Sequence, residues 1–533
     1  MLRHSFATDV LEAQSDRFDD FALRLRDTDN VAVAKRPLAA GLSLNGSVSL
    51  ITNREIPAGH KIALAAIPEG EAILKYGQVI GYARRRIEPG EHVHTHNVRM
   101  RDDADDRTQL AHECCVDYRP LELYPLQQMR YYQGYQRPEG RVGTRNYVGV
   151  ISSVNCSASV SRYVTDRFRG ADFARDFPNV DGVIPFTHKG GCAIQLGQPH
   201  EVLKRVLAGV AKHPNIFGYV MIGLGCETNQ VSFIRSDYRL DVIKPDEARP
   251  LFINIQDAGG VRKTVDAAAD AVRKLLARAN EARRTKQPIS KLILALNCGG
   301  SDGNSGITAN PALGVASDEL VKFGGTSVLA ETPEIYGAEH LLLRRAVNQE
   351  VAEKLLKQLR WWEDHVKLFG ASIDNNPTFG NKQGGLTTIY EKSLGAVAKG
   401  GQSPLMAVYD YAQRIDKPGF GFMDTPGYDP VSMTGLVCGG CNIGCFTTGR
   451  GSVYGCKPAP CIKIATNTPM FERMRDDMDI NAGTILDGTE TLEQVGMRIF
   501  EKIIAVAGGE KTKSELAGIG DEEFAPWMLG PTF

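Results

Sequence analysis

The sequence predicts an α/β protein with a small N-terminal all-β domain and a larger parallel α/β region in two parts. Short apolar segments separated by Pro- and Gly-containing turns recur between residues 27 and 100, which is typical of strands. From residue 131, apolar β-rich runs alternate with amphipathic helical segments, and this alternation predicts a parallel sheet. A Gly-rich break at 374–385 divides the larger region. The 533 residues are enough for several domains.

The elements follow one another in a regular order. Residues 1–26 predict a peripheral extension, and turns such as "PAGH", "PEGE" and "EPGE" punctuate the all-β domain at 27–100. The polar segment 101–130 lacks a sustained period and predicts a linker. Strands such as "NYVGVISSV" and "FGYVMIGLG", with helices such as "EVLKRVLAGVAKH", predict one α/β domain over 131–375. A second α/β domain is expected over 376–533.

The composition is that of an ordinary soluble protein. The net charge of −1 gives no bias toward nucleic acid or anionic membranes. We see no N-terminal signal and no apolar stretch of the length of a spanning helix, so we expect a cytoplasmic protein that binds neither nucleic acid nor membrane. Eleven cysteines in such a chain favour thiols, metal ligands or redox sites over disulfides. The oligomeric state stays open, with a homo-oligomer as one alternative.

Four cysteines each follow an apolar run that predicts a buried strand. They are Cys156 in "VISSVNCSAS", Cys192 in "VIPFTHKGGC", Cys226 in "GYVMIGLGCE" and Cys298 in "KLILALNCGG". The carboxyl ends of parallel strands meet at one crevice, and thiolates there suit iron, zinc or an iron–sulfur cluster. The spacing does not separate a single metal ion from a cluster. The alternative is that these thiols are buried as small apolar side chains.

The segment "EHVHTHNV" places His92, His94 and His96 at alternate positions. Alternate residues of a strand share a face, so the three imidazoles are candidates for binding a divalent metal. The alternative is a polar strand face beside a turn.

A second group of cysteines surrounds "CGGCNIGC". A CxxC pair favours a metal site when a second pair follows, but the following "CKPAPC" is irregular and contains two prolines. These thiols are either metal ligands or the lining of a Gly-rich turn, and they are Cys438, Cys441, Cys445, Cys456 and Cys461.

Two Gly-rich loops, "CGGSDGNSG" at 298–306 and "TTGRGSVYG" at 447–455, are candidates for binding an anion. Backbone N–H groups in such loops surround anions, and Arg450 could hold a carboxylate through two parallel hydrogen bonds. "GNKQGG" adds Lys382, and "YEKSLG" adds Glu391 and Lys392, although a charged loop residue is often only solvated. We find neither a Walker loop nor a G-x-S-x-G elbow, so a nucleotide enzyme is not favoured.

These motifs together resemble the altronate dehydratase and galactarate dehydratase family over nearly the whole chain. Within the family, "EHVHTHN", "LGCETNQV" and "ETPEIYGAEHLL" look more like altronate dehydratase. The N-terminal extension, segment 101–130 and the cysteines near 438–461 depart from the usual altronate pattern. The segments that carry the resemblance are "DTDNVAVA" (27–34), "GHKIAL" (59–64), "ILKYGQVIGYA" (73–83), "GRVGTRN" (140–146), "IGLGCE" (222–227), "CGGSDGNSGITANP" (298–311), "GNKQGGLTTIYEKSLG" (380–395) and "FTTGRGSVYG" (446–455).

The resemblance implies a β-clip (SAF-type) N-terminal domain joined to a Rossmann-like catalytic region. It also implies the loss of water from a sugar acid, such as D-altronate or alternatively galactarate, to give a 2-keto-3-deoxy acid. The implied cofactor is iron, as Fe²⁺ or as an iron–sulfur cluster, with Mn²⁺ as a substitute. A sulfo-lyase acting on a related hydroxy acid and an inactive ligand-binding homologue remain as alternatives.

The candidate residues follow from these patterns and from the resemblance. Removing the proton at C2 of a hydroxy acid needs a cation near the carboxylate, together with an acid and a base. His188 in "FTHKGGC" matches a histidine of the family motif and is a candidate base or acid, although a structural histidine bonded to a loop carbonyl is equally expected. The second catalytic candidate is Lys392. The expected substrate ligands are Arg450, Lys382, Ser301, Asp302 and Thr448, and the expected metal ligands are His94, His96, Cys156, Cys192 and Cys226.

Overall fold

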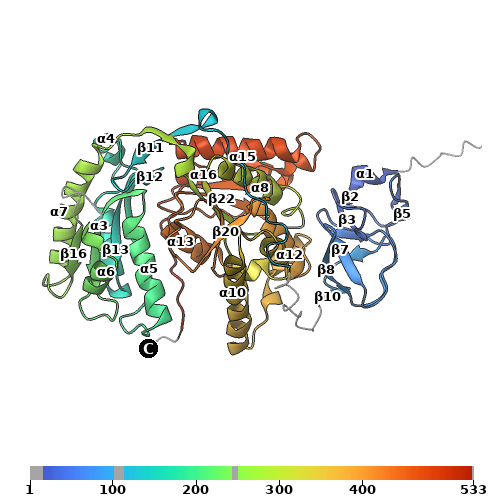
Figure 1. Ribbon diagram of the computed structural model, residues 1–533, viewed down its shortest axis with the longest axis horizontal. Helices are drawn as coiled ribbons and strands as arrows, with labels where there is room; N and C mark the ends of the chain where they lie inside the picture. Colours follow the sequence, from blue (N-terminus) through green and yellow to red (C-terminus); the bar gives the residue numbers. More distant parts are fainter. Residues whose placement is uncertain (1–15, 101–112, 243–249, 531–533) are drawn as a thin grey trace, which may run out of the picture. The chain divides into compact units, whose positions relative to one another are not determined.

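The computed structural model describes residues 16–100, 113–242 and 250–530. The chain divides into two compact units (Figure 1). The first unit contains Met1–Ala104 and Pro377–Glu391, and the second contains Asp105–Asn376 and Lys392–Phe533. No helix in the described ranges has both the length and the apolar composition needed to cross a membrane.

The first unit is built from short strands, which confirms the predicted all-β domain. Its strands form three small sheets, with orders β2-β3-β6-β9, β10-β8-β7 and β1-β4-β5. The strands are β1 (Asp16–Arg17), β2 (Ala22–Leu23), β3 (Val31–Ala34), β4 (Ser43–Asn45), β5 (Leu50–Ile51), β6 (Lys61–Ala63), β7 (Ala72–Lys75), β8 (Gln78–Ala83), β9 (His92–Val93) and β10 (Val98–Arg99).

Two segments of the first unit differ from the prediction. Residues 18–22 contribute to its core, because α1 (Phe18–Phe21) buries Phe18 completely beside Leu44 and Ile62. Segment 377–391, which lies far away in the sequence, also packs here. It contains α11 (Phe379–Gln383), and Thr388 Oγ1 donates to the carbonyl of Ile80 at 2.5 Å.

A four-stranded parallel sheet forms the first part of the second unit. Its order is β14 (Gly182–Phe186), β13 (Tyr147–Ser152), β15 (Ile216–Gly223) and β16 (Leu251–Asn254). One face packs against α5 (Gln198–Lys212), and the other packs against α3 (Ala158–Asp166) and α7 (Val261–Ala279). Figure 1 shows the sheet between α5 and α7. The buried side chains of α7 recur at helical spacing, which is the pattern that predicted this helix.

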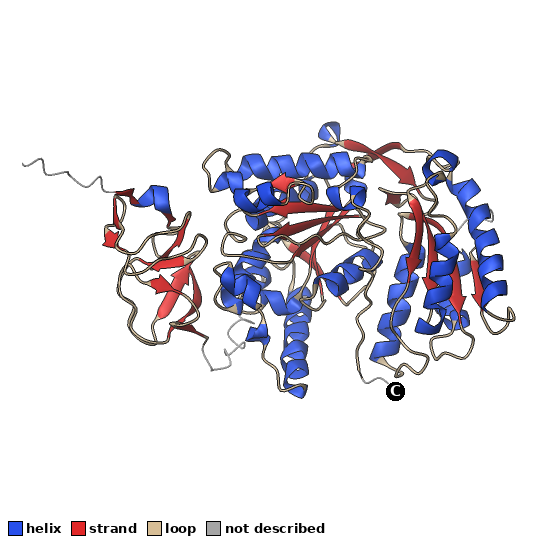
Figure 2. Cartoon of the chain, turned by 180° about the vertical axis from the view of Figure 1, so that it is seen from behind, coloured by secondary structure: helices blue, strands red, loops and turns tan. Residues whose placement is uncertain are grey.

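A seven-stranded sheet forms the second part, and all its printed strand pairs are parallel. Figure 2 shows this sheet between its helices. Helix α13 (Asp429–Gly439) packs against the face that presents Ala295, Val328 and Phe446, and α8 (Ala309–Lys322) packs against α15 (Leu492–Ala507). The strand order is β20 (Leu405–Tyr409), β21 (Gly419–Met423), β19 (Thr326–Leu329), β18 (Ile293–Cys298), β22 (Ile443–Thr448), β23 (Cys461–Ala465) and β24 (Ile480–Asn481).

This sheet crosses the boundary predicted at residues 375 and 376. Strands β18 and β19 come before that boundary and the other five come after it. The chain order also reverses at β18, since β19 pairs with one of its edges and β22 with the other. In open α/β sheets a ligand binds at the carboxyl ends of the strands where the order reverses. Helices α9 (His340–Leu343) and α10 (Gln349–Leu368) follow β19 in the chain, with a break between them.

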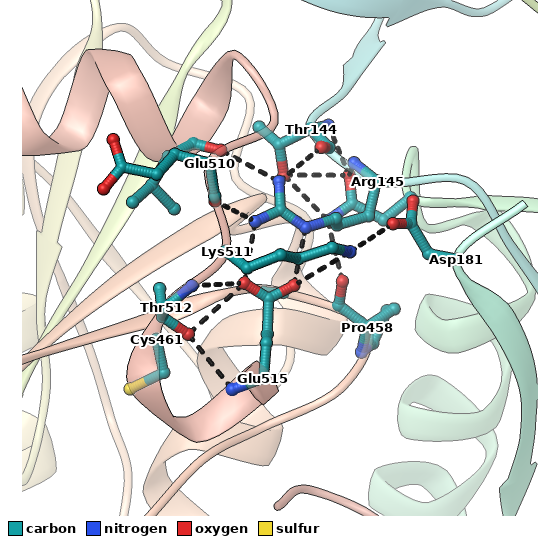
Figure 3. Close-up of polar contacts among 12 residues, drawn as sticks. Thr144, Arg145, Asp181, Pro458, Cys461, Glu510, Lys511, Thr512 and Glu515 are labelled. Carbon is teal, nitrogen blue, oxygen red and sulfur yellow. Dashed lines mark hydrogen bonds and ion pairs between the residues drawn. The ribbon is translucent and has the colours of Figure 1, made fainter. Parts of the chain in front are cut away.

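Buried Arg145 joins the two parts of the second unit (Figure 3). It lies two residues after β12 (Val142–Gly143), which belongs to an antiparallel sheet with β11 (Tyr131–Gln136) and β17 (Thr285–Pro288). Its guanidinium binds both carboxylate oxygens of Glu515 at 2.6 and 2.7 Å, and also donates to the carbonyls of Val506 and Glu510 at 2.8 Å. The motif "GRVGTRN" therefore contains a structural arginine that holds the C-terminal helices.

Candidate functional site

A cluster of buried ionisable side chains lies at the carboxyl ends of β18 and β19. Cys298 is the last residue of β18, Glu331 follows β19 by two residues, and Glu334 lies in the short helix Thr332–Ile335. Each offers one ligand atom, and these atoms all lie within 4.8 Å of one another. In the described ranges this is the only such group of three or more His, Cys, Asp or Glu residues. Glu331 has the left-handed backbone conformation, with φ of 74°, which is rare for a residue other than glycine.

Two lysines pair with these three side chains. The Nζ of Lys399 lies 2.8 Å from the sulfur of Cys298 and 3.6 Å from Glu331. The Nζ of Lys392 donates to Glu334 at 2.7 Å and to Asn376 at 2.8 Å. Burial alone would lower the pKa of both lysines, but their anionic neighbours outweigh it and raise the pKa above its ordinary value. Both lysines are therefore ammonium groups at neutral pH.

The carboxyl groups of the cluster titrate in a different range from ordinary carboxyl groups. Burial, followed by repulsion from Glu334, raises the pKa of Glu331 well above its usual value and that of Asp429 to about 7. Asp429 begins α13 and packs against Gly299, where a Cβ would collide with its carboxylate. One oxygen of Glu331 is buried without a hydrogen-bond partner among the described residues. The site thus combines fixed positive charges with carboxyls that can hold a proton near neutral pH.

The two Gly-rich loops predicted from the sequence meet at the point where the strand order reverses. The backbone N–H groups of Gly449 and Arg450 donate to the carbonyl of Gly300 at 3.0 and 2.8 Å. Gly300 has φ of 61°, and a Cβ there would lie 3.2 Å from the Thr448 hydroxyl. The side chain of Arg450 is exposed, whereas Ser301 is buried. The structure therefore brings these loops together beside the charged cluster.

Asp302 and Thr448 hold these loops through contacts within the protein. The carboxylate of Asp302 accepts hydrogen bonds from the hydroxyls of Ser305 and Thr466 at 3.0 Å and from the Asn467 amide at 3.2 Å. The Thr448 hydroxyl accepts the N–H groups of Gly451 and Ser452 at 3.1 and 2.9 Å. These contacts occupy most of the acceptor sites of Asp302 and Thr448, so few remain for a substrate. Direct substrate binding by these two residues stays a prediction.

Sequence comparisons agree with this arrangement. Residues 20–101 match the altronate/galactarate dehydratase SAF domain. Residues 134–280 match the second domain of D-galactarate dehydratase/altronate hydrolase, and residues 289–532 match the C-terminal domain of D-galactarate/altronate dehydratase. The chain is 38% identical to galactarate dehydratase (L-threo-forming) of Escherichia coli (strain K12), over 94% of this chain and 95% of that protein. The chain belongs to the D-galactarate/altronate dehydratase family.

Two further relatives bear on the substrate. The chain is 34% identical to altronate dehydratase of Bacillus subtilis (strain 168), over 92% of this chain and 96% of that protein. It is also 30% identical to the beta subunit of (2R)-sulfolactate sulfo-lyase of Chromohalobacter salexigens, over 74% of this chain and 96% of that protein. Identities of 38% and 34% are too similar to separate galactarate from altronate as the substrate. The matched domains confirm the predicted SAF-type domain followed by an α/β region.

His188, which belongs to the family motif, lies in the loop that follows β14 of the four-stranded sheet. His188 is buried, its Nδ1 accepts the N–H of Gly190 at 3.1 Å, and its Nε2 lies 3.1 Å from the carbonyl of Ser152. Burial lowers its pKa to about 4, so the ring is neutral at pH 7. Because both ring nitrogens already contact backbone, the geometry favours a structural role, and the catalytic role stays a prediction.

The four cysteines at strand ends divide between two sheets. Cys156, Cys192 and Cys226 follow β13, β14 and β15 of the four-stranded sheet and are exposed. Cys298 ends a strand of the seven-stranded sheet and is buried. The four cysteines therefore do not follow strands of one sheet, because equivalent positions after strands do not show which strands pair; one shared crevice for all four stays a prediction.

The histidines of the first unit come together in a different way from the prediction. The strand ends at Val93, and a turn follows in which the His94 N–H donates to the Asn97 side chain at 2.9 Å. The rings of His92 and His94 are nevertheless 5.3 Å apart, those of His92 and His96 are 5.5 Å apart, and His60 joins the group with its Nδ1 3.0 Å from His92. Metal binding by His94 and His96 stays a prediction.

The same unit contains a buried charge cluster that the sequence did not show. Lys61 and Lys75 contact the carboxylate of Glu391 at 2.8 and 2.9 Å. Burial would raise the pKa of Glu391, but the two ammonium groups hold it well below its usual value. Lys382 contributes its carbonyl to His94 at 2.8 Å, and substrate binding by its side chain stays a prediction.

The cysteines around "CGGCNIGC" are side chains of the hydrophobic core. All five are buried; Cys441, Cys456 and Cys461 pack among residues such as Met433, Leu436 and Phe446, and Cys438 packs in the core with residues of α5. Burial raises the pKa of Cys438 and Cys441, which keeps these thiols protonated. The structure favours the non-metal alternative for this group.

Proposed function

We propose that this protein is a sugar-acid dehydratase, a carbon–oxygen lyase that converts an aldonate such as D-altronate to a 2-keto-3-deoxy acid and water. The observation that carries the proposal is the buried cluster of Lys392, Lys399, Glu331 and Asp429 at the carboxyl ends of β18 and β19. It lies where an open α/β sheet binds its ligands, and the matched family domains span it. Galactarate is the alternative substrate, supported by the 38% identity to a galactarate dehydratase.

The two ammonium groups supply the positive charge that the reaction needs. Removing the C2 proton adds negative charge next to a carboxylate, and fixed cations in a dry site stabilise that charge as it develops. Lys392 and Lys399 are buried and held by Glu334 and Cys298, so they need no reorientation during the reaction. This gives Lys392, which the sequence nominated, an electrostatic role rather than that of a base.

The carboxyl groups with raised pKa are suited to the proton transfers. An ionised carboxylate accepts the C2 proton, and a protonated carboxyl group gives its proton to the C3 hydroxyl as the C–O bond breaks. The products are water and an enol, which tautomerises to the 2-keto acid, so atoms and charge balance. Asp429, with a pKa of about 7, suits the base, and Glu331, whose pKa burial and Glu334 raise well above its usual value, suits the acid.

We propose that the two Gly-rich loops bind the substrate. Arg450 is exposed on the loop that follows β22, and its planar guanidinium can bind the substrate carboxylate through two parallel hydrogen bonds. Ser301 lies on the facing loop and is suited to a substrate hydroxyl. An aldarate has a second carboxylate, so galactarate would require a further cation on the far side of the site.

The iron that the family resemblance implies fits this cluster only in part. The thiol of Cys298 with two carboxylates is a suitable donor set for iron, which would supply a Lewis acid for the leaving hydroxyl. However, Lys399 contacts Cys298 and Glu331, and Lys392 contacts Glu334, so each donor is already paired with an ammonium group. A divalent ion here would have to displace Lys399 from Cys298 and Glu331, so the cluster as arranged does not fit a metal ion.

A substrate panel tests the proposal. Protein prepared with ferrous iron, or with Mn²⁺ as the substitute, is incubated separately with altronate, galactarate, other aldonates and aldarates, and sulfolactate. We expect a 2-keto-3-deoxy acid from altronate at the highest kcat/KM. A higher value for galactarate would select the alternative, release of sulfite from sulfolactate would identify a sulfo-lyase, and no product from any compound would indicate an inactive homologue.

A further inference from the structure

A cavity lined by cations lies where the C-terminal ends of α5 and α13 pack against each other (Figure 1). Its volume is about 110 Å³, and roughly 10–15 Å³ is enough for one water molecule. Within the described residues, the lining of this cavity contains no carboxylate side chain. Its cations are Arg141, Arg205, Lys212 and Arg414.

A second cavity, of about 200 Å³, adjoins the first and shares Arg141 and Arg414 with it. The two arginines therefore span one basic cleft. The residues that the second cavity adds include two lysines, two hydroxyl groups and one carboxylate, and these are Lys291, Lys417, Ser290, Thr326 and Asp416.

The cleft lies at the opposite edge of the seven-stranded sheet from the candidate functional site. Its lining includes Ile293 and Thr326, which are the first residues of β18 and β19. Cys298, in the candidate functional site, is the last residue of β18. The six residues of this strand span ~17–20 Å. The cleft is therefore a separate place in the molecule.

The cations of the cleft have few partners within the protein. Arg205 donates to a backbone carbonyl at 2.8 Å, and Arg141 pairs with Glu139 at 2.8 Å. The Nε of Arg141 is buried and has no hydrogen-bond partner among the described residues. Neither Arg414 nor Lys212 forms an ion pair with any residue that the structure describes. Buried polar atoms almost always have partners, so the free Nε indicates a group that the protein alone does not supply.

Like charges in the cleft repel one another. Burial lowers the pKa of both Arg141 and Lys212, Glu139 opposes that shift, and the nearby charge of Arg414 lowers both values further. The fold holds these cations together in spite of the repulsion. An anion between them would offset it.

The two helix ends account for only part of this positive charge. A helix C-terminus carries about half a negative charge, so the ends of α5 and α13 offset about one of the four cations. Glu139 offsets one more, which leaves about two positive charges without compensation. Arg141 and Arg414 belong to neither helix, so capping of the helix ends does not explain their position.

We propose that this cleft binds the phosphoryl group of a small molecule. A phosphate monoester carries about −1.5 to −2 charges at pH 7, which matches the charge that remains. Arg141 and Arg414 are suited to it, because the planar guanidinium binds phosphate oxygens through two parallel hydrogen bonds. A single carboxylate carries one charge and would leave the second arginine uncompensated.

The second cavity gives room for the rest of the ligand. Its hydroxyl groups, on Ser290 and Thr326, are suited to hydroxyls of a phosphorylated metabolite. The proposal does not rest on the dehydratase reaction, because it uses no residue of the candidate functional site.

Isothermal titration calorimetry of the full-length protein at constant ionic strength tests the site. The probes are inorganic phosphate, glucose 6-phosphate and citrate, and we expect one site per chain for a phosphate compound. Tighter binding of glucose 6-phosphate than of inorganic phosphate would identify a phosphate ester as the ligand, and equal or weaker binding would identify free phosphate. Binding of citrate alone, or of none of the probes, would overturn the proposal.

A charge reversal locates the bound phosphate. Arg414→Glu should weaken phosphate binding by roughly 10–100-fold or more, because it removes a charge-assisted hydrogen bond and adds a repulsive charge. Arg262→Glu is the matched control, since Arg262 is exposed on α7, across the four-stranded sheet from α5, and the net charge changes equally. This control should keep wild-type binding. Equal weakening in both variants would show a general effect of net charge and overturn the site.

Two further variants keep the test decisive. Lys212→Ala should also weaken phosphate binding, and it replaces Arg414→Glu as the test if circular dichroism shows that the latter does not fold. Arg450→Ala removes an exposed arginine of the candidate functional site and should leave phosphate binding unchanged. Binding that is lost in Arg450→Ala but kept in Arg414→Glu and Lys212→Ala would place the anion at the candidate functional site and overturn the proposal.

Discussion

The ammonium group of Lys399 lies 2.8 Å from the sulfur of Cys298, and both side chains are buried. Burial raises the pKa of Cys298 to about 11, although Lys399 opposes that shift. Burial lowers the pKa of Lys399, but Cys298, Glu331 and Glu334 outweigh burial and raise it, so the lysine is charged. This pairing places a buried cation among carboxyl groups, which is the basis of the proposed charge stabilisation.

Lys399→Met should reduce kcat strongly, because it removes this cation while keeping a side chain of similar length. Loss of one fixed charge-stabilising group costs about 10²–10³-fold in comparable sites. Steady-state kinetics with the substrate found in the panel measures the effect. Lys357→Met on the exposed side of α10 serves as the control and should keep wild-type turnover. A kcat within a factor of about two of wild type for Lys399→Met would place this lysine outside the chemistry.

Asp429→Asn should make the protein more stable and less active. The pKa of Asp429 is raised to about 7 by burial and by Glu334, so the folded state binds its proton more tightly than the unfolded state, whose pKa is about 3.9. Between these two values the stability of the wild type falls as pH rises, and above pH 7 the loss is constant. Asn removes this dependence and should raise the free energy of unfolding at pH 8 by at most about 4 kcal/mol.

Urea denaturation between pH 4 and 8 measures this change. The difference between Asp429→Asn and wild type should grow with pH across that window, while kcat falls because the proposed base is lost. A variant that is less stable than wild type at pH 8 would show that the carboxylate is compensated in the folded state.

The local pattern of the sequence predicted the fold class but not how the strands pair. Alternation of apolar runs and helical segments located β13, β15, α5 and α7. The seven-stranded sheet, however, combines strands from both sides of residue 376, and segment 377–391 returns to the N-terminal unit. Pairing between distant segments leaves no periodic signal in either segment, so a break rich in Gly and Asn looked like a domain boundary.

The sequence predicted the Gly-rich loops of the candidate site but missed most of its buried charged residues. Gly-rich sequences identified 298–306 and 447–455, because the backbone at Gly300 requires a conformation that favours glycine. Glu331, Lys399 and Asp429 were missed, since a single charged residue in a loop looks the same whether it is solvated or buried beside a partner. The segment "ETPE" directly after the strand "GTSVLA" was the available signal for Glu331.

The first unit should lose stability in mild acid because of its histidines. Burial, and then repulsion from neighbouring cations, lower the pKa of His92 to about 3 and of His94 to about 4. Between these values and the ordinary pKa of about 6.5, the unfolded state binds protons that the folded state does not, so stability falls as pH falls. Each histidine should contribute a slope of about 1.4 kcal/mol per pH unit.

Hydrogen exchange of the amides in β3, β6 and β9 measures this effect within the unit. Protection should decrease between pH 6.5 and 4 after correction for the intrinsic exchange rate, and His92→Gln should reduce the decrease. A pH-independent free energy of opening in the wild type would show that the histidines are protonated equally in both states.

Arg145→Lys should destabilise the second unit, because lysine cannot make the forked contact with both oxygens of Glu515 (Figure 3). Lysine keeps the charge, but its ammonium group cannot reach Glu515 and the carbonyls of Val506 and Glu510 together, so some of these contacts are lost in a buried site. Removing one partner of a buried pair costs about 3–5 kcal/mol, and we expect a loss below that figure. Guanidinium denaturation gives the value. Arg162→Lys is the control, because the contact of Arg162 with Glu522 is exposed, and it should change stability by less than about 1 kcal/mol. Equal losses of stability in both variants would contradict a special role for Arg145.

Arg450→Lys should lower kcat/KM without lowering stability, because this arginine is exposed and is our proposed ligand of the substrate carboxylate. Lysine keeps the charge but loses the planar fork, so we expect a cost of about 2–4 kcal/mol in kcat/KM, which is roughly 30–1000-fold. Arg475→Lys, an exposed arginine paired with Glu472, is the control and should keep wild-type kinetics.

Chemical rescue separates a direct contact of Arg450 from an indirect one. Added guanidinium ion should restore part of the activity of Arg450→Ala if the missing group binds the carboxylate, and it should not restore the activity of Lys399→Met, whose site is buried. A kcat/KM for Arg450→Lys equal to wild type would show that the loop at 447–455 acts only through its backbone, by holding Gly300 and the loop that follows β18.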